Sequence, residues 1–164
     1  SEWAQAEAQL SCYFALLLGT TPQDALAKLD RKPASQVIKE TRKIVDVKMA
    51  DDEFASIQAI LDRLEAVSTR RNRVQHDLWV RKMGEQDALY AVHAHEYLRF
   101  VTGIVQMADQ TDAVERSIEL ADEFVLKAAN RYTLSILDGL QNEIHSIVVD
   151  LNSAFFQRIQ SSAG

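Results

Sequence analysis

The stretch DDEFASIQAILDRLEAVSTRRNRVQHDL, residues 51–78, decides the fold of this chain. Its apolar side chains recur every three or four residues, which is the spacing of one buried face on an α-helix. They are Phe54, Ile57, Ile60, Leu61, Leu64, Val67, Val74 and Leu78. Carboxylates at positions 51–53 stand where the positive end of a helix dipole favours negative charge. The pattern therefore predicts a long central helix over residues 51–78.

The segments on either side of this helix are also mostly helical in pattern. The same spacing predicts helices near residues 3–18, 22–29 and 35–45, and a helical remainder over 96–160. Within this remainder we predict segments over residues 97–107, 112–130 and 133–160. Residues 79–83 and 88–93 flank a four-residue turn and are typical of a short β-hairpin. We predict an all-α, up-and-down bundle of about five to six helices with a short hairpin after the central helix. Residues 1–164 are expected to form a single domain.

Composition limits the function classes. The chain has 164 residues, 47% hydrophobic and 26% charged, with 5 Gly and 2 Pro, which is typical of a folded helical protein. Its longest apolar run, Tyr13–Leu18, is far short of the roughly 20 residues that cross a bilayer. The single cysteine, Cys12, is expected to be a small buried side chain without disulfide or zinc chemistry. We expect a cytoplasmic protein with no membrane partner and no cofactor.

Positive charge is concentrated in one segment of this acidic chain. The net charge is −6, yet residues 70–82 carry five cations against one carboxylate, a local charge of +4. The five cations are Arg70, Arg71, Arg73, Arg81 and Lys82. Arg71 also falls on the predicted inward stripe, seven residues after Leu64, where a guanidinium needs an oxygen partner. The segment is therefore the strongest candidate for binding an anion.

A polar stripe on the same helix adds a second kind of chemistry. Asn72 and His76 are four residues apart, so they share a helix face with neighbouring Arg73. Histidine moves protons near neutral pH, and arginine holds phosphate oxygens and stabilises their growing charge. This combination suits phosphodiester cleavage of RNA, whose own 2′-hydroxyl is the nucleophile, so that no metal is required. The alternative is a basic last turn that complements the helix dipole, with Arg71 in a structural ion pair.

The hexapeptide RNRVQH, residues 71–76, matches an arginine–histidine signature with a polar residue after the arginine. It resembles the motif of the HEPN superfamily, whose bacterial helical members often carry the pattern RN-x3-HG-x-W. Asn72, His76 and Trp79 match that pattern, and Asp77 stands where the glycine is expected. Asp77 either tunes the neighbouring imidazole or repels RNA. The resemblance implies a helical homodimer in which the motifs of two copies form a composite, metal-independent endoribonuclease site.

The resemblance also implies a role for each matched residue. Arg71 would bind the scissile phosphate, His76 would transfer a proton, and Asn72 would orient one of them. Trp79 would pack beneath the site as structural support. The other cations of the segment are predicted RNA contacts, namely Arg70, Arg73, Arg81 and Lys82. The expected partners are a second copy, RNA, and an antitoxin or nucleotidyltransferase, in a bacterial stress, toxin–antitoxin or defence role.

Two alternatives stay open at this point. The chain could be a non-catalytic module for dimerisation or for binding a nucleotide or protein, its arginines matched by Asp62, Glu65 or Asp77. Separately, His93 and His95 would share one face of an extended segment, as metal ligands do. With no third ligand evident beyond the nearby Glu96, we favour solvent-facing histidines at the edge of the hairpin and predict no metal site.

Overall fold

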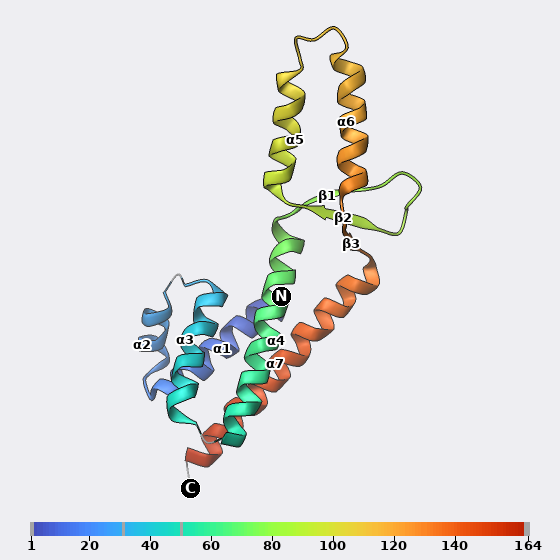
Figure 1. Cartoon of the computed structure of the whole chain (residues 1–164). Helices are drawn as coiled ribbons and strands as arrows, with labels where there is room; N and C mark the ends of the chain where they lie inside the picture. The colour runs from blue at the N-terminus through green and yellow to red at the C-terminus, as the bar shows by residue number, and fades with distance from the viewer. Residues whose placement is uncertain (1, 31, 50, 163–164) are drawn as a thin grey trace. The chain divides into compact units, whose positions relative to one another are not determined.

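The computed structural model describes residues 2–30, 32–49 and 51–162. It confirms the predicted all-α fold with a short hairpin (Figure 1), and the described residues form seven helices and three short strands. The elements are α1 (Glu2–Leu18), α2 (Pro22–Leu29), α3 (Ala34–Lys48), α4 (Asp51–His76), β1 (Leu78–Val80), β2 (Leu89–Val92), α5 (Ala94–Gln106), α6 (Ala113–Lys127), β3 (Asn130–Tyr132) and α7 (Leu134–Ser162). No helix of these described ranges is long and apolar enough to cross a membrane.

The chain divides into two compact units, each described here by itself. The first unit comprises residues 1–69 and 140–164, and the second comprises residues 70–139. Helices α4 and α7 each contribute one part to the first unit and the other part to the second.

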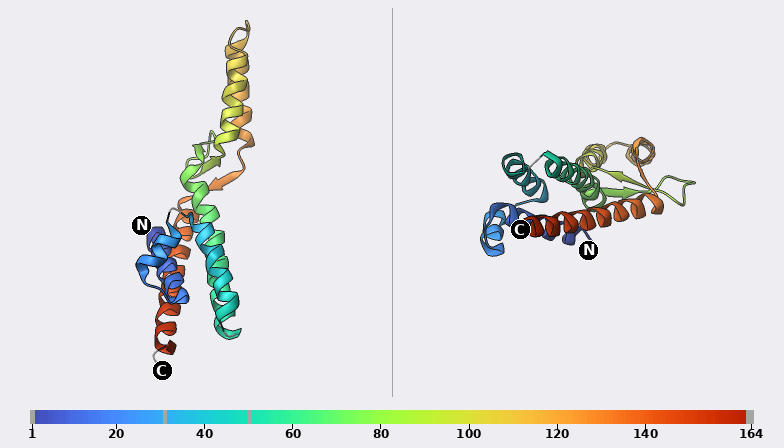
Figure 2. Two further views of the ribbon diagram at one scale, coloured as in Figure 1. Left: turned by 90° about the vertical axis from the view of Figure 1, so that its left-hand side faces the viewer. Right: turned by 90° about the horizontal axis from the view of Figure 1, so that it is seen from below.

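The first unit holds the main hydrophobic core. In it, α1 lies beside α2 and α3 (Figures 1 and 2). These three helices belong to one compact unit with residues 51–69 of α4 and residues 140–162 of α7. Its fully buried side chains include Leu10, Tyr13, Ile38, Val45, Ile57, Leu61, Leu64, Val67, Ile147 and Leu151. The predicted inward stripe of the central helix is therefore confirmed from Ile57 to Val67. Ion pairs connect α4 to its neighbours in this unit: Asp62 pairs with Arg42 of α3, and Arg63 pairs with Asp150 of α7.

The connection from α1 to α2 follows from local residue chemistry. Gly19 adopts a φ of 65°, the left-handed conformation that ends a helix most easily when no Cβ is present. Thr21 then caps α2, because its Oγ1 accepts a hydrogen bond from the backbone N–H of Asp24 at 3.2 Å. The predicted helix over residues 22–29 is confirmed. Cys12, predicted to be buried, is exposed on α1, between core positions that face the other way.

The second unit is built on a three-stranded antiparallel sheet. The strand order is β1–β2–β3, with Leu78 opposite Val92 and Ala91 opposite Asn130. Helices α5 and α6 run antiparallel as a helical hairpin inserted between β2 and β3 (Figures 1 and 2). The predicted helix reaching residue 130 is wrong at its end: α6 stops at Lys127, and residues 130–132 pair with β2 instead.

Candidate functional site

The RNRVQH motif occupies the last turns of α4, which ends at His76. Arg71 is half-buried there, whereas Asn72 and His76 are exposed. One guanidinium nitrogen of Arg71, Nη1, donates a hydrogen bond to Oδ1 of Asn72 at 3.3 Å. His76 follows Asn72 by four residues and so lies one turn further along the same helix face. The end of α4 therefore presents an amide and an imidazole to solvent beside a guanidinium.

The inward stripe of α4 opens toward solvent as it approaches the motif. Val67 and Ser68 are buried, but Arg71 and Val74 are only half-buried. The central helix also ends at His76, two residues before the predicted end at Leu78, which is exposed on β1. Arg71 thus stands at the stripe's polar end, where its stem can pack while the charged group keeps access to water.

The predicted RNA-contacting cations fall into two groups. Arg70 and Arg73 on α4, and Arg81 just after β1, are exposed. Lys82 is engaged inside the second unit: its Nζ donates to the backbone oxygen of Leu126 at 3.1 Å and lies 4.2 Å from the centre of the Tyr90 ring. The three arginines thus reach solvent, whereas Lys82 connects the loop after β1 to α6 and β2.

The acids considered as partners for the motif's arginines have partners elsewhere. Asp62 and Glu65 pair with Arg42 of α3, at 2.7 and 3.1 Å. Asp77 pairs with His93, at 3.2 Å. These carboxylates therefore contribute to the packing of α3 on α4 and to the start of the sheet.

Asp77, which stands where the pattern that RNRVQH resembles has glycine, is the most unusual side chain near the motif. It follows α4 directly, and its backbone N–H donates to the Arg73 oxygen at 2.9 Å. Its side chain is only 4% exposed. Oδ1 lies 3.2 Å from Nδ1 of His93, while Oδ2 is buried and has no hydrogen-bond partner among the described residues. A buried carboxylate oxygen without a partner is costly, so this position calls for an explanation.

The strand register explains why Asp77 meets His93. Leu78 of β1 lies opposite Val92 of β2, so the next antiparallel pair outward is Asp77 with His93. His93 is the N-cap residue of α5, makes no capping bond with its side chain, and leaves 56% of that side chain exposed. The sequence analysis did not predict this pair. Pairing the two predicted strands residue by residue outward from the turn would have placed residue 77 opposite residue 93.

The alternative in which His93 and His95 share one face of an extended segment does not apply, and both histidines are exposed, as expected. Helix α5 begins at Ala94, so His95 lies in a helical turn and not on a strand. Glu96 and His95 are both exposed. Across the described part of the chain, no group of three or more His, Cys, Asp or Glu side chains is placed to hold a metal ion.

Trp79 lies on β1, where it stays 36% exposed on one face of the sheet. It stands opposite Ala91 of the middle strand, and its ring meets that of Tyr132 on β3 edge-on, with ring centres 5.2 Å apart. The small side chain of Ala91 leaves room for this contact across the middle strand. Trp79 thus fixes β1, the strand that directly continues from the motif.

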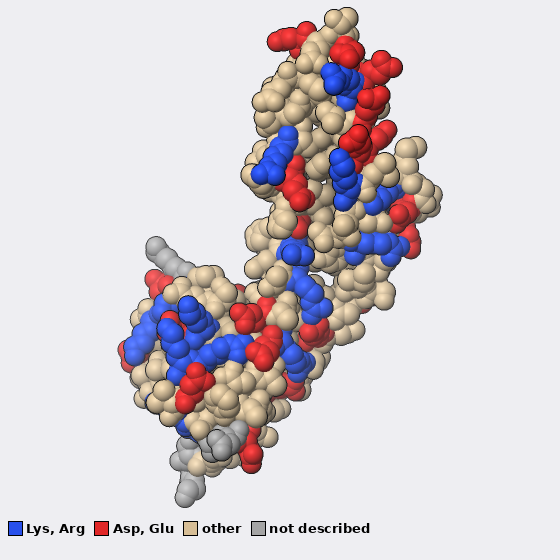
Figure 3. All heavy atoms as spheres, viewed as in Figure 1, with Lys and Arg blue, Asp and Glu red and all other residues tan. Residues whose placement is uncertain are grey.

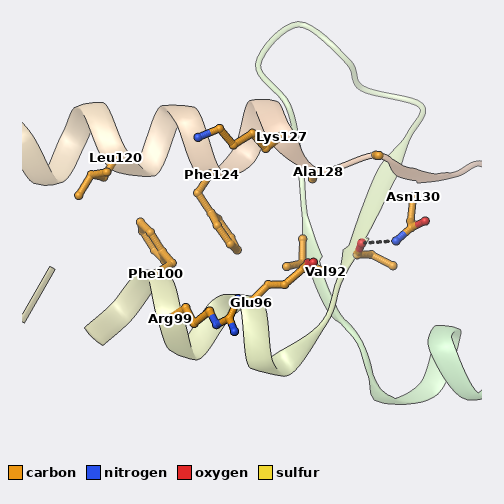
Figure 4. A pocket seen from close by; sticks show the side chains of 11 residues that line it. Val92, Glu96, Arg99, Phe100, Leu120, Phe124, Lys127, Ala128 and Asn130 are labelled. Carbon is orange, nitrogen blue, oxygen red and sulfur yellow. Dashed lines mark hydrogen bonds between the residues drawn. The ribbon is translucent and has the colours of Figure 1, made fainter. Parts of the chain in front are cut away.

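A pocket of about 410 Å³ lies between the base of the α5–α6 hairpin and the adjoining ends of β2 and β3 (Figure 4). Phe100 and Phe124 form its apolar wall as a stacked pair, with ring centres 4.5 Å apart. Glu96, Arg99 and Lys127 supply its charged groups. Sequence reasoning missed the pocket because it joins segments about 25 residues apart that no local pattern connects.

Comparison of the chain with protein-family models, with curated proteins and with solved structures gives no match. Its function is therefore inferred from the chemistry of the residues at the end of α4 and the start of the sheet.

Proposed function

We propose that this chain is a metal-independent endoribonuclease of the HEPN type that acts as a homodimer. The observation that carries the proposal is the end of α4, where Arg71 is bonded to Asn72, and the exposed His76 lies one turn beyond Asn72 on the same helix face. A cation, its positioning amide and a proton-transfer group thus share the last turns of one helix. These are the groups that cleavage of RNA by its own 2′-hydroxyl needs.

In the proposed reaction, the 2′-oxygen attacks the adjacent phosphorus and the bond to the 5′-oxygen breaks. Arg71 holds the phosphate and stabilises the charge that grows on its oxygens. His76 transfers a proton, and Asn72 keeps the guanidinium in place. In a composite site, the motifs of two copies would face one another across the dimer. We also propose that an antitoxin or a nucleotidyltransferase is the protein partner of this chain, in a bacterial stress or defence role.

The exposed arginines support RNA as the substrate. Arg70, Arg73 and Arg81 lie next to the motif in sequence and reach solvent in a chain whose net charge is −6. Phosphate contacts supply most of the affinity of a protein for nucleic acid. A local basic segment on an acidic protein directs RNA to one place, which is the place where the imidazole lies.

The direct test is an RNA-cleavage assay in the presence of a chelator. The purified protein is incubated with labelled single-stranded RNA and transfer RNA, beside His76→Ala and the matched control Gln75→Ala, which alters an exposed neighbour on the same turn. We expect the unaltered protein and Gln75→Ala to cleave and His76→Ala to be inactive with an unchanged melting temperature. An active His76→Ala variant, or no cleavage by the unaltered protein, contradicts the proposal.

A second candidate function, a non-catalytic dimerisation module, is favoured by one surface. The α5–α6 hairpin has no fully buried residue among its helices, and one face of it forms an apolar groove. The groove is lined by Ile104, Val105, Ala108, Ala113, Val114, Ser117, Ile118 and Ala121. None of these residues is charged, and short amphipathic helices depend on packing of their apolar face.

The charges beside the groove fit a second copy as its occupant. Acidic side chains gather along α6 (Figure 3), with Glu115 and Asp122 next to Ile118, whereas α5 borders the groove with uncharged Thr102 and Gln106. A two-fold arrangement with α6 of one copy opposite α5 of the other keeps like charges apart. Val105→Glu should convert the dimer to monomer in sedimentation, whereas Gln106→Glu should not. A dimeric Val105→Glu variant contradicts this interface.

A further inference from the structure

The contact between Asp77 and His93 brings a second imidazole close to the catalytic motif. Asp77 directly follows His76, and Asp77 and His93 are neighbours across the ladder. Adjacent Cα atoms are about 3.8 Å apart and cross-strand pairs about 5.5 Å, so the Cα atoms of His76 and His93 are within roughly 10 Å. Both histidines are exposed and belong to the second unit. Cleavage of RNA uses a general base and a general acid, and two imidazoles suit both roles.

We propose that His93 is a second catalytic residue of this site, acting as the general base, and that Asp77 is its positioning residue. The inference rests on the proposed ribonuclease function and extends it, because His93 lies outside the motif. His76 is then the general acid.

The contact suggests a role for each nitrogen of His93 in the proposed step. An ionised carboxylate only accepts hydrogen bonds, so the step uses the tautomer with its hydrogen on Nδ1, the nitrogen 3.2 Å from Oδ1 of Asp77. Nε2 then has the lone pair, on a side chain that is more than half exposed. The carboxylate also stabilises the positive imidazolium that forms when Nε2 takes up a proton. The geometry therefore suits His93 for accepting a proton from a substrate.

The proposed step is balanced in protons and bonds. Nε2 of His93 removes the proton of the 2′-hydroxyl, and the 2′-oxygen forms a bond to phosphorus. The bond from phosphorus to the 5′-oxygen breaks, and His76 gives its proton to that leaving oxygen. The products are a 2′,3′-cyclic phosphate and a 5′-hydroxyl. Water exchanges the protons afterwards, so that both histidines return to their starting states.

Burial of Asp77 suits a positioning role. Its backbone N–H donates to the Arg73 oxygen, and its enclosed side chain has few other conformations open to it beside His93. Oδ2 accepts no bond from the described residues. Within the described part of the chain, His93 is therefore the side chain placed to balance the negative charge of Asp77.

The test compares three variants on a normal RNA and on one whose scissile 5′-oxygen is replaced by sulfur, a leaving group that needs no proton. His93→Gln should lower kcat by about 100-fold or more on both substrates, because the base is still required. His76→Ala should be inactive on the normal RNA and regain cleavage of the sulfur substrate. The matched control His95→Gln, an exposed histidine two residues away, should cleave both like the unaltered protein.

A second readout does not depend on activity. Nitrogen chemical shifts of the His93 ring should report a hydrogen on Nδ1 in the unaltered protein, and Asp77→Asn should abolish that preference while lowering kcat more than it changes KM. Full cleavage by His93→Gln while His76→Ala is inactive would overturn this inference and leave the proposed function standing. Absence of cleavage by the unaltered protein would overturn both.

Discussion

Arg71 and Asn72 are adjacent in sequence, yet the guanidinium of one donates to the side-chain oxygen of the other at 3.3 Å. Neighbouring residues on a helix point about 100° apart, so the long arginine side chain has to turn along the helix surface to make this contact. The bond occupies one of the five N–H donors of a guanidinium. Asn72 thereby holds one guanidinium nitrogen of Arg71 at the end of α4.

The first prediction concerns this pair. Arg71→Ala should lower cleavage or weaken dimerisation, and Asn72→Ala should lower cleavage less, because the charge remains and only its direction is lost. Because each change weakens stabilisation of the transition state, we expect the cleavage rate to fall about 100-fold for Arg71→Ala and about 10-fold for Asn72→Ala. Single-turnover cleavage and sedimentation measure the two effects. A fully active, fully dimeric Arg71→Ala variant would remove Arg71 from the site.

A second prediction concerns the exposed cations. Affinity for single-stranded RNA falls with salt by a slope of about −0.7 for each phosphate contacted. Arg73→Gln should therefore make the slope shallower by about 0.7. Arg116→Gln, which alters a cation bonded to Gln110 beside α6, is the control and should leave the slope unchanged. Equal slopes for Arg73→Gln and the unaltered protein would show that Arg73 contacts no phosphate.

Lys82 should behave differently from the arginines. Because its Nζ is bonded to Leu126 and lies over the Tyr90 ring, Lys82→Gln should reduce stability by about 1 kcal/mol. The RNA affinity of this variant should change little. Denaturant unfolding and RNA titration on the same variant separate the two effects. Weaker RNA binding at unchanged stability would place Lys82 among the RNA contacts instead.

A third prediction concerns Tyr90, whose hydroxyl donates to both oxygens of Glu85, at 2.8 and 3.0 Å. The hydrogen bond to this carboxylate, together with desolvation, raises the pKa of Tyr90 above its ordinary value. Glu85→Gln should lower that pKa, as measured by the alkaline absorbance of tyrosinate. Asp87→Asn, which alters the neighbouring acid paired with Arg131, should have a smaller effect.

The direction of the pH dependence follows from the raised pKa. The folded protein holds the Tyr90 proton more tightly than the unfolded chain, so the stabilisation is complete below the ordinary tyrosine pKa and is lost as the pH rises through the raised value. Glu85→Gln should remove this alkaline loss of the free energy of unfolding. An unchanged alkaline profile would contradict the role given to the Tyr90–Glu85 bond.

A fourth prediction tests the core of the first unit. Ile147 of α7 is 0% exposed, whereas Ile159 on the same helix is 40% exposed. Ile147→Ala should lower the free energy of unfolding by about 2–5 kcal/mol, and Ile159→Ala by clearly less, because truncation of a fully enclosed side chain leaves a cavity. Denaturant titrations of both variants provide the comparison. Equal losses would contradict the assignment of Ile147 to the core.

The sequence allowed the fold class to be predicted because the helices have strong local signals. The spacing from Ile57 to Val67 and the Thr21-Pro22 start of α2 each depend on a few neighbouring residues. β3 could not be predicted in the same way. Residues 130–132 form a strand only because β2 offers a free edge, and a segment of three residues has no period of its own. The single-domain organisation stays a prediction.

The candidate site was predictable in part. The motif and the basic segment are local, so Arg71, Asn72 and His76 were named from the sequence, and the structure places them in the last turns of one helix. The partnership of Asp77 with His93 depends on strand register, which joins residues 16 positions apart. The pocket beside Phe100 and Phe124 depends on contacts between α5 and α6. The catalytic roles themselves stay predictions.

The most direct test of the central claim uses two oligonucleotides that differ by one oxygen. One is an all-RNA strand that the protein cuts at a mapped position, and the other carries a 2′-deoxy sugar at that position only. With chelator present, we predict cleavage of the RNA strand to a 2′,3′-cyclic phosphate and no cleavage of the deoxy-substituted strand at that bond. Cleavage of both strands, or products that end in a 3′-hydroxyl, would contradict attack by the 2′-hydroxyl at a site formed by Arg71, Asn72 and His76.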